Sequence, residues 1–436
     1  MLKPSLTRFS FVLVATACLL VALPALADSQ ARIVRLSDVQ GSVQIDKNTG
    51  LGLENAFVNL PITQGTKLRT GGNGRAEIEF EDGSSVRLAP NSSVEFTKLS
   101  LNDAGKRMSQ LDLAEGEAYV NWLGKDEIAL NFAKESVALD HAAHFRAETS
   151  AEVASLAVFK GDVEVQSPSG NVKVEKKKTA TFDPDNDKYT VANKIIEEPL
   201  DSWDKESIDY HSQYAKNNNS SPYGYGLADL NYYGAYSNVP GYGLMWQPYF
   251  AGIGWDPFLD GAWGFYPGFG YMFASAYPWG WMPYRYGNWL FVPGMGWMWQ
   301  PGGWNTWLAV PRYTPTTLAR VNLVAPAAGT TRTVVVGRAA TSSAFSSRMV
   351  VNKGSAGMGI PRGSLGNLGH LNQQVTKSGS AAVRPAPQFS ATSSGRASAG
   401  HSGSRSSGGG ASMASPSMSA GHASTSGHAS SSGSHR

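Results

Sequence analysis

Short runs of alternating apolar and polar residues, separated by turn residues, fill the chain from residue 32 to about residue 195. Such alternation predicts half-buried β-strands, because successive side chains of a strand point to opposite faces. The clearest runs lie at 39–45, 75–88, 116–120, 155–159 and 162–165. The pattern therefore predicts an all-β domain over residues 32–195.

The segment 75–88 predicts a β-hairpin, and its facing pattern selects the register. Its apolar positions alternate along both arms: Ala76, Ile78, Phe80, Val86 and Leu88. A two-residue loop would pair apolar with polar positions, whereas a three-residue loop over 81–83 pairs apolar with apolar positions. The last loop residue is then left-handed, a conformation that Gly83 adopts without steric cost. The same register places Glu77 opposite Arg87 on the face that we expect to contact solvent.

Several short motifs in this region resemble the FecR domain in their order and spacing. They are Gly41-Ser42-Val43, Gly65-Thr66-Lys67-Leu68-Arg69-Thr70, Arg75-Ala76-Glu77-Ile78, Asp82-Gly83-Ser84, Arg87-Leu88-Ala89-Pro90-Asn91-Ser92 and Val158-Phe159-Lys160-Gly161-Asp162-Val163. The resemblance covers about residues 36–180 and implies a β-rich extracytoplasmic module that binds a partner. The founding FecR system signals to a cytoplasmic sigma factor through a retained membrane helix. This sequence predicts no such helix, so the sigma-factor role is not carried over.

Beyond Pro199 the apolar positions no longer recur at every second residue but at every third or fourth. This spacing predicts a linking helix over 199–217. Apolar and small positions follow the helical spacing: Leu200, Trp203, Ser207, Tyr210 and Tyr214. Pro199 suits a first helical turn, and the segment Asn217-Asn218-Asn219 with Pro222 ends the helix. We expect Trp203 to pack on a neighbouring sheet.

An internal repeat follows within residues 222–313. Its three copies begin at Gly234, Gly261 and Gly287 and obey G-[AN]-[YW]-x-x-x-P-G-x-G-x-M-[WF]. Each copy predicts a strand, a Pro-Gly turn and a second strand, with turns at Pro240-Gly241, Pro267-Gly268 and Pro293-Gly294. Type II is not the favoured two-residue hairpin turn, so the sequence leaves the loop length and register open. We expect the glycines inside the second strand to leave room for an aromatic ring.

The aromatic residues of this module have two interpretations. Ten of the twelve Trp lie in 246–307, and aliphatic residues are scarce, so the rings can supply the buried area themselves. Alternatively, some rings are exposed and contact a protein or a sugar. The candidate binding rings are Trp255, Trp263, Trp281, Trp289, Trp297 and Trp304. The block resembles an uncharacterised Trp/Tyr/Gly/Pro-rich region that follows FecR domains in other secreted bacterial proteins, and this resemblance implies no known activity.

The two ends of the chain predict export and disorder. Lys3 and Arg8 precede an apolar run over 9–23 and the triplet 25–27, the order of a signal peptide cleaved after residue 27. We therefore expect a periplasmic, outer-membrane-associated or extracellular protein. Residues 314–436 predict a basic, Ser/Gly/Ala-rich and largely disordered tail, because such a composition buries little apolar area. The tail suits peripheral contact with anionic surfaces rather than nucleic acid.

The sequence predicts no catalytic, cofactor or metal site. Cys18, the only cysteine, lies in the leader, and nucleophile-elbow, P-loop and zinc-binding motifs are missing. The one dense His/acid cluster, Asp140, His141 and His144, is interpreted as structural, and carboxylates such as Glu117 as a solvated face. We therefore predict a non-enzymatic envelope protein that binds or scaffolds an envelope protein. Polysaccharide binding and FecR-type signalling are the alternatives, and the oligomeric state is open.

Overall fold

The computed structural model of the chain describes residues 32–151, 154–183, 185–216, 221–267, 269–304, 337–338 and 347–385. All of these fall within one compact unit, Met1–Thr392. The predicted leader with Cys18, and the tail beyond residue 385, lie outside the described residues. Within the described part, no helix has the length and apolar character needed to cross a membrane.

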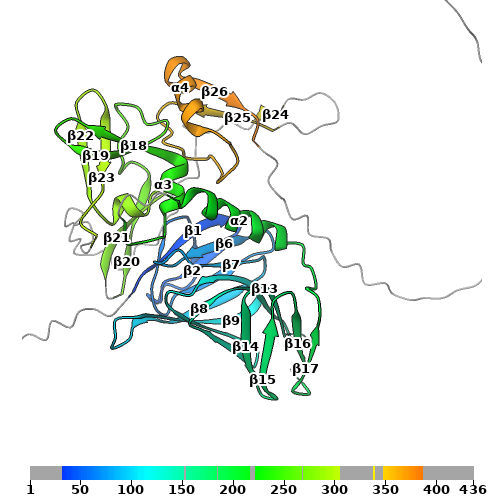
Figure 1. Cartoon of the computed structure of the whole chain (residues 1–436). Helices are drawn as coiled ribbons and strands as arrows, with labels where there is room; N and C mark the ends of the chain where they lie inside the picture. The colour runs from blue at the N-terminus through cyan, green and yellow to red at the C-terminus, as the bar shows by residue number, and fades with distance from the viewer. Residues whose placement is uncertain are drawn as a thin grey trace, which may run out of the picture. The chain divides into compact units, whose positions relative to one another are not determined.

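Residues 34–192 form two sheets that share one long strand, β9 (Arg107–Leu123), which confirms the predicted all-β domain (Figure 1). Sheet A runs through β3 (Glu54–Asn55), β2 (Val43–Asp46), β5 (Lys67–Thr70), β8 (Ser93–Leu101), β9, β10 (Glu127–Phe132), β11 (Glu135–Leu139), β14 (Asp162–Ser167) and β15 (Gly170–Glu175). Sheet B runs through β4 (Pro61–Ile62), β1 (Val34–Gln40), β6 (Arg75–Glu79), β7 (Ser85–Leu88), β9, β12 (Ala142–Thr149), β13 (Ala154–Lys160), β16 (Thr179–Asp183) and β17 (Lys188–Ala192). Only the β9–β10 pair is parallel among these.

An aliphatic core fills the space between the two sheets, because the apolar phase of each strand points inward. Strand β9 passes from sheet A to sheet B at Gly116, where φ is +88°. A Cβ atom at this position would lie 2.3 Å from Ser92 Oγ and 2.6 Å from the Asn91 carbonyl oxygen. The crossover therefore requires glycine for both its backbone conformation and its close contact.

The predicted hairpin over 75–88 is confirmed. Strands β6 and β7 pair Ile78 with Val86. The three-residue loop after Phe80 ends at Gly83, whose φ is +92° and whose N–H donates to the Phe80 carbonyl. Gly224 packs on this loop, and its N–H donates to the Glu81 carbonyl at 2.7 Å. The loop is thus a contact point for the chain beyond the β domain.

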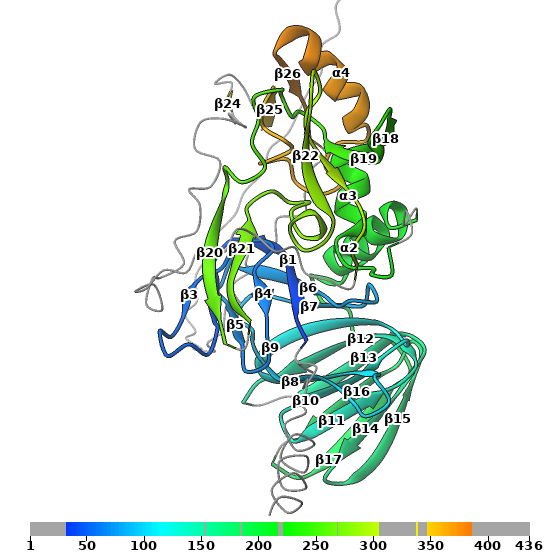
Figure 2. The same cartoon turned by 90° about the vertical axis from the view of Figure 1, so that its left-hand side faces the viewer.

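The predicted linking helix is also confirmed as α2 (Asp201–Tyr214), which lies on the outer face of sheet B (Figures 1 and 2). Trp203 is buried there with its ring edge-on to Tyr119 at a centroid distance of 6.3 Å. A second, shorter helix, α3 (Leu227–Tyr233), leads into the aromatic module.

Each aromatic repeat forms a β-hairpin, as predicted. The pairs are β18 (Gly234–Val239) with β19 (Gly243–Pro248), β20 (Gly261–Tyr266) with β21 (Gly270–Ser275), and β22 (Asn288–Val292) with β23 (Gly296–Gln300); a 3-10 turn, η1 (Met282–Tyr284), precedes the third. The loop has three residues: the Tyr242 N–H donates to the Val239 carbonyl, and Gly241 has a φ of +80°. Gly294 is equivalent, with a φ of +78°, whereas Gly268 lies outside the described residues.

The predicted contact between rings and glycines occurs at different glycines. Nothing lies within 4 Å of a Cβ built on Gly243, which opens the second strand. A Cβ on Gly234, which opens the first strand, would instead lie 2.4 Å from the Trp246 ring. Gly261 and Gly287 lie equally close to the rings of Phe273 and Trp299, at 2.2 and 2.6 Å. The reason is that the glycine of the second strand provides a positive φ next to the turn. The ring carried by the second strand lies instead diagonally across the hairpin, against the glycine that begins the repeat.

Part of the predicted disordered tail is folded. Residues 347–385 contain β25 (Ser347–Asn352), α4 (Leu368–Ser378) and β26 (Ser380–Val383), and Gly337–Arg338 form β24. Their sparse apolar residues bury against the aromatic module, which the weak periodicity of this segment did not reveal. Tyr233 Oη donates to the Ile360 carbonyl at 2.6 Å, and Trp279 Nε1 to the Ala356 carbonyl at 2.7 Å.

Candidate functional site

The outer face of sheet B carries charged side chains that other segments of the chain cover wholly or in large part. We call this set the charge layer; it comprises Arg35, Glu77, Glu79 and Arg87 of the sheet with Asp204, His211, Asp229 and Arg362 from the segments that cover it. Glu77 and Arg87 do lie opposite each other, as predicted. The expectation that they contact solvent is wrong, because α2 covers them and leaves 2% and 0% of their surfaces exposed.

Arg87 bridges a neighbouring strand of sheet B and α2 with two ion pairs. Its Nε donates to Glu77 Oε2 at 2.8 Å, and its Nη1 donates to Asp204 Oδ1 of α2 at 2.8 Å. The other oxygen of Asp204 contacts His144 Nε2 of β12 at 2.7 Å. One face of α2 therefore contacts Arg87 and His144, which come from two strands of sheet B.

His211 makes the second attachment of α2. Its two ring nitrogens face two carboxylates, with Nε2 at 2.9 Å from Glu77 Oε1 and Nδ1 at 3.3 Å from Glu79 Oε1. Burial alone lowers the pKa of His211, but Glu77 and Glu79 outweigh it and raise this pKa above its usual value. Burial likewise favours a neutral Glu77, yet the charges of His211 and Arg87 hold the Glu77 pKa well below its usual range. Both shifts favour the charged forms of the two groups, and so favour an ion pair.

Asp229 and Arg362 join distant parts of the chain to the same layer. Asp229 of α3 is fully buried and pairs with Arg35 Nη1 at 2.7 Å. Arg362 donates from Nε to Asp229 Oδ1 at 2.8 Å and from Nη1 to Glu77 Oε1 at 2.7 Å. Burial opposes the charged form of Asp229, but Arg362 and Arg35 lower its pKa below the usual value. The β domain, α3 and the C-terminal segment thus share one network.

The sequence pattern predicts only the Glu77–Arg87 pair of this network. Asp229 gave the only signal, since it is one of three acidic residues beyond residue 210. Arg362 lies in a segment without clear periodicity, and 285 residues separate it from Glu77. Local pattern alone contains no information on such a pairing.

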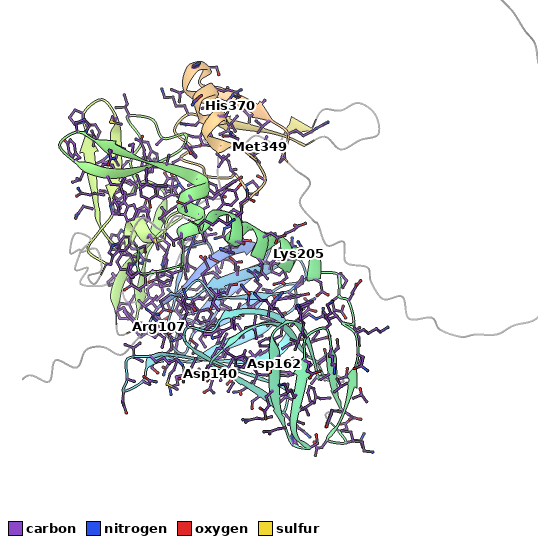
Figure 3. The ribbon with its side chains drawn as sticks, in the orientation of Figure 1. Arg107, Asp140, Asp162, Lys205, Met349 and His370 are labelled. Carbon is purple, nitrogen blue, oxygen red and sulfur yellow. The ribbon has the colours of Figure 1, made fainter. Side chains whose placement is uncertain are left out.

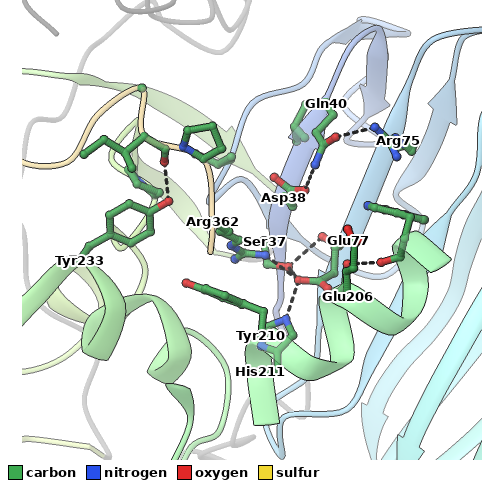
Figure 4. A pocket seen from close by; sticks show the side chains of 18 of the residues that line it. Ser37, Asp38, Gln40, Arg75, Glu77, Glu206, Tyr210, His211, Tyr233 and Arg362 are labelled. Atoms are coloured by element: carbon green, nitrogen blue, oxygen red, sulfur yellow. Dashed lines mark hydrogen bonds and ion pairs between the residues drawn. The ribbon is translucent and has the colours of Figure 1, made fainter. Parts of the chain in front are cut away.

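A cavity of about 530 Å³ opens beside the charge layer, between β1, β6, α2 and residues 359–362 (Figure 4). At its wall, Arg75 Nη2 donates to Gln40 Oε1 at 2.9 Å, and Gln40 Nε2 donates to Asp38 Oδ2 at 2.7 Å. Burial raises the pKa of Asp38, although the nearby Arg362 opposes this rise. Charges of both signs line the cavity, which therefore suits a polar group better than an apolar one.

The His/acid cluster noted in the sequence is split between two environments. His141 is exposed and lies at 3.2 Å from Asp140 and at 3.1 Å from the carbonyl of Asp162, two residues that Figure 3 labels. His144 points instead to α2. Across the described ranges, no group of three or more His, Cys, Asp or Glu side chains is arranged to hold a metal ion.

Glu117 departs from the solvated face expected for it. It is half-buried and lies directly opposite Glu148 on β12. Burial raises the Glu117 pKa to about 7, although a hydrogen bond with Tyr119 opposes the rise.

The six candidate rings lie in different environments. Trp281 and Trp255 have 0% and 5% of their surfaces exposed, so the expectation of an exposed ring is wrong for these two. They are needed in the interior because the module has few aliphatic residues. Three rings are half-buried against the aromatic core: Trp289, Trp297 and Trp304. Trp263 is 42% exposed.

The outer face of sheet A contrasts with the charge layer. A row of directly paired, outward-facing residues crosses it, which we call the polar platform: Lys67, Glu95, Asp112, Asn131, Ser136, Gln166 and Asn171. All seven side chains are exposed or half-buried. A hollow of about 430 Å³ lies on the same sheet, lined in part by Lys98, Gln110 and Glu127.

Comparison with known proteins identifies two regions. Residues 66–164 match the family described as FecR protein, and residues 227–324 match a family of unknown function, DUF6600. Two crystal structures, at 1.65 and 2.50 Å, of a protein described as "a putative anti-sigma factor from Parabacteroides distasonis ATCC 8503" are 17% and 16% identical to the chain. The similarity spans 29% of this chain and 59% of that protein, with a TM-score of 0.26. No curated protein matches the chain.

Proposed function

Because this chain is a FecR-domain protein that also carries a DUF6600 region, we propose that it is a non-enzymatic regulatory protein of the cell envelope that binds a protein partner. We assign the contact to the polar platform of sheet A. One observation supports this assignment: described segments of the chain cover the outer face of sheet B, whereas none of the described residues buries the polar platform of sheet A.

The chemistry of the platform suits a reversible protein contact. Lys67 and Glu95 form an exposed ion pair at 3.2 Å, and Asn131 Nδ2 donates to Asp112 Oδ1 at 2.6 Å. Charges of both signs on an open face can be matched by complementary charges of a partner, and such matching gives an interface its specificity. In this proposal the DUF6600 region braces sheet B and holds the β domain rigid.

Site-specific photo-crosslinking in cells tests the proposal. A photoreactive residue at Ser136 or at Gln166, in neighbouring strands of the platform, is expected to give one and the same crosslinked partner. The matched control is Ser202, which is exposed on α2, and it should give no such product. Cell fractionation of the same samples checks for export. Different products from the two platform sites, or an equal product from Ser202, would contradict the assignment.

A carbohydrate contact is favoured at one position only. Trp263 is 42% exposed, and its ring contacts that of Phe273 in a tilted arrangement at a centroid distance of 5.5 Å. Aromatic faces of this kind suit the apolar faces of sugars. Affinity electrophoresis in cell-wall polysaccharide should show retardation of the chain and its loss on Trp263→Ala; equal retardation of the variant would exclude this ring.

A further inference from the structure

Each sheet of the β domain ends in two edge strands, and these four edges differ. Edge strands present unpaired backbone groups, and proteins protect them by short length, proline or charged side chains. Strands β3 and β4 have only two residues each, and β4 begins with Pro61. Strand β15 is longer, but it exposes Lys173 and Glu175. Three of the four edges thus carry a protective feature.

Strand β17 is the exception. It pairs with β16 over five residues, and no other strand pairing is recorded for it among the described residues. Its sequence, Lys-Tyr-Thr-Val-Ala, is rich in β-formers and has one charge, at its first position. Tyr189 and Val191 share one phase of the strand and are 44% and 37% exposed. Figures 1 and 2 both show β17 at the margin of the domain.

We propose that β17 pairs in antiparallel orientation with β17 of a second copy of this chain, about a two-fold axis at Thr190. In this register Tyr189 of each copy lies opposite Val191 of the other. Aromatic and β-branched residues form favourable cross-strand pairs, and both would lose exposed apolar surface.

The charges around β17 agree with this register. Lys188 of one copy lies opposite Ala192 of the other, so the two lysines do not meet. Lys194, exposed just after the strand, comes near the acidic turn that precedes β17 in the other copy. That turn exposes three carboxylates: Asp183, Asp185 and Asp187. A parallel arrangement would instead place like charges together.

A cysteine trap tests the register in the full chain with Cys18→Ser as background. Directly opposed residues of an antiparallel pair have Cα atoms roughly 4.5–5.5 Å apart, within the range of a disulfide. Thr190→Cys should therefore form a reducible dimer under mild oxidation. The matched control is Lys173→Cys on the protected edge β15, which should stay at least about tenfold less crosslinked. Adding Val191→Lys to Thr190→Cys should abolish the dimer without changing the melting midpoint.

Sedimentation of the chain without a new cysteine gives an independent readout. The contact is small, so we expect the average mass to rise only between roughly 10 μM and 1 mM. A monomer throughout this range, or equal crosslinking at positions 190 and 173, would overturn the proposal. Crosslinking of Thr190→Cys to a different protein would also overturn it and would assign the edge to that partner.

Discussion

The two outer faces of the β domain have similar sequence patterns and opposite environments. In sheet B the row Glu77, Arg87, Tyr119 and Arg146 is at most 2% exposed. In sheet A the corresponding row, which begins with the Lys67–Glu95 pair, stays in contact with water. Alternation therefore shows which side chains leave the aliphatic core, but not what covers them.

Among substitutions on the two faces, removal of the Glu77 side chain should cause the largest loss of folding stability. Glu77→Ala leaves Arg87 and His211 buried without the carboxylate that both contact, and such a change typically costs about 3–5 kcal/mol. Urea unfolding followed by tryptophan fluorescence measures the loss. Glu77→Gln keeps the shape and tests the charge separately. A loss below about 1 kcal/mol for Glu77→Ala would show that the layer is not coupled to folding.

A smaller loss of folding stability is expected from a substitution within the aromatic module. Gly234→Ala places a Cβ atom 2.4 Å from the Trp246 ring, which is buried. Overpacking of this kind costs about 1–3 kcal/mol. Thermal unfolding measures the change, with Gly254→Ala as the control, because no atom lies within 4 Å of a Cβ there. Equal midpoints for the two variants would contradict the ring-over-glycine contact.

These contacts indicate how far the sequence predicts the structure. The hairpin at Gly83, helix α2 and the three repeat hairpins depend on residues close in sequence, and the pattern predicts them correctly. Glu77 is buried by His211 of α2, 134 residues away, and by Arg362, 285 residues away, so the local alternation predicts a solvent-exposed face instead. The sequence leaves the burial of Trp281 open, because an aromatic-rich segment suits both a core and an exposed surface.

The pH dependence of folding stability should also differ between contacts on the outer faces of sheets A and B. Burial and the charge of Arg362 lower the folded pKa of His211, but Glu77 and Glu79 outweigh both and raise it. The ring of Tyr210 lies beside that of His211. Its contribution is therefore fully present below the unfolded histidine pKa of about 6.5, and it is lost as pH rises through the higher folded pKa. We expect stability, measured by urea unfolding at a series of pH values, to fall as pH rises above about 6.5. His211→Gln should flatten this fall, and an unchanged profile would contradict the ion pair.

The smallest effect on folding stability is expected from a substitution in the polar platform. Lys67 and Glu95 are 55% and 38% exposed, so water stabilises each charge when its partner is removed. Glu95→Ala should therefore cost less than about 1 kcal/mol, against about 3–5 kcal/mol for Glu77→Ala, although both are carboxylates paired across neighbouring strands. A double-mutant cycle with Lys67→Ala measures the coupling, which should fall further at high salt. If the coupling matched that of Glu77 with Arg87, burial would not be what separates the two faces, and the platform would be a structural network rather than a free surface.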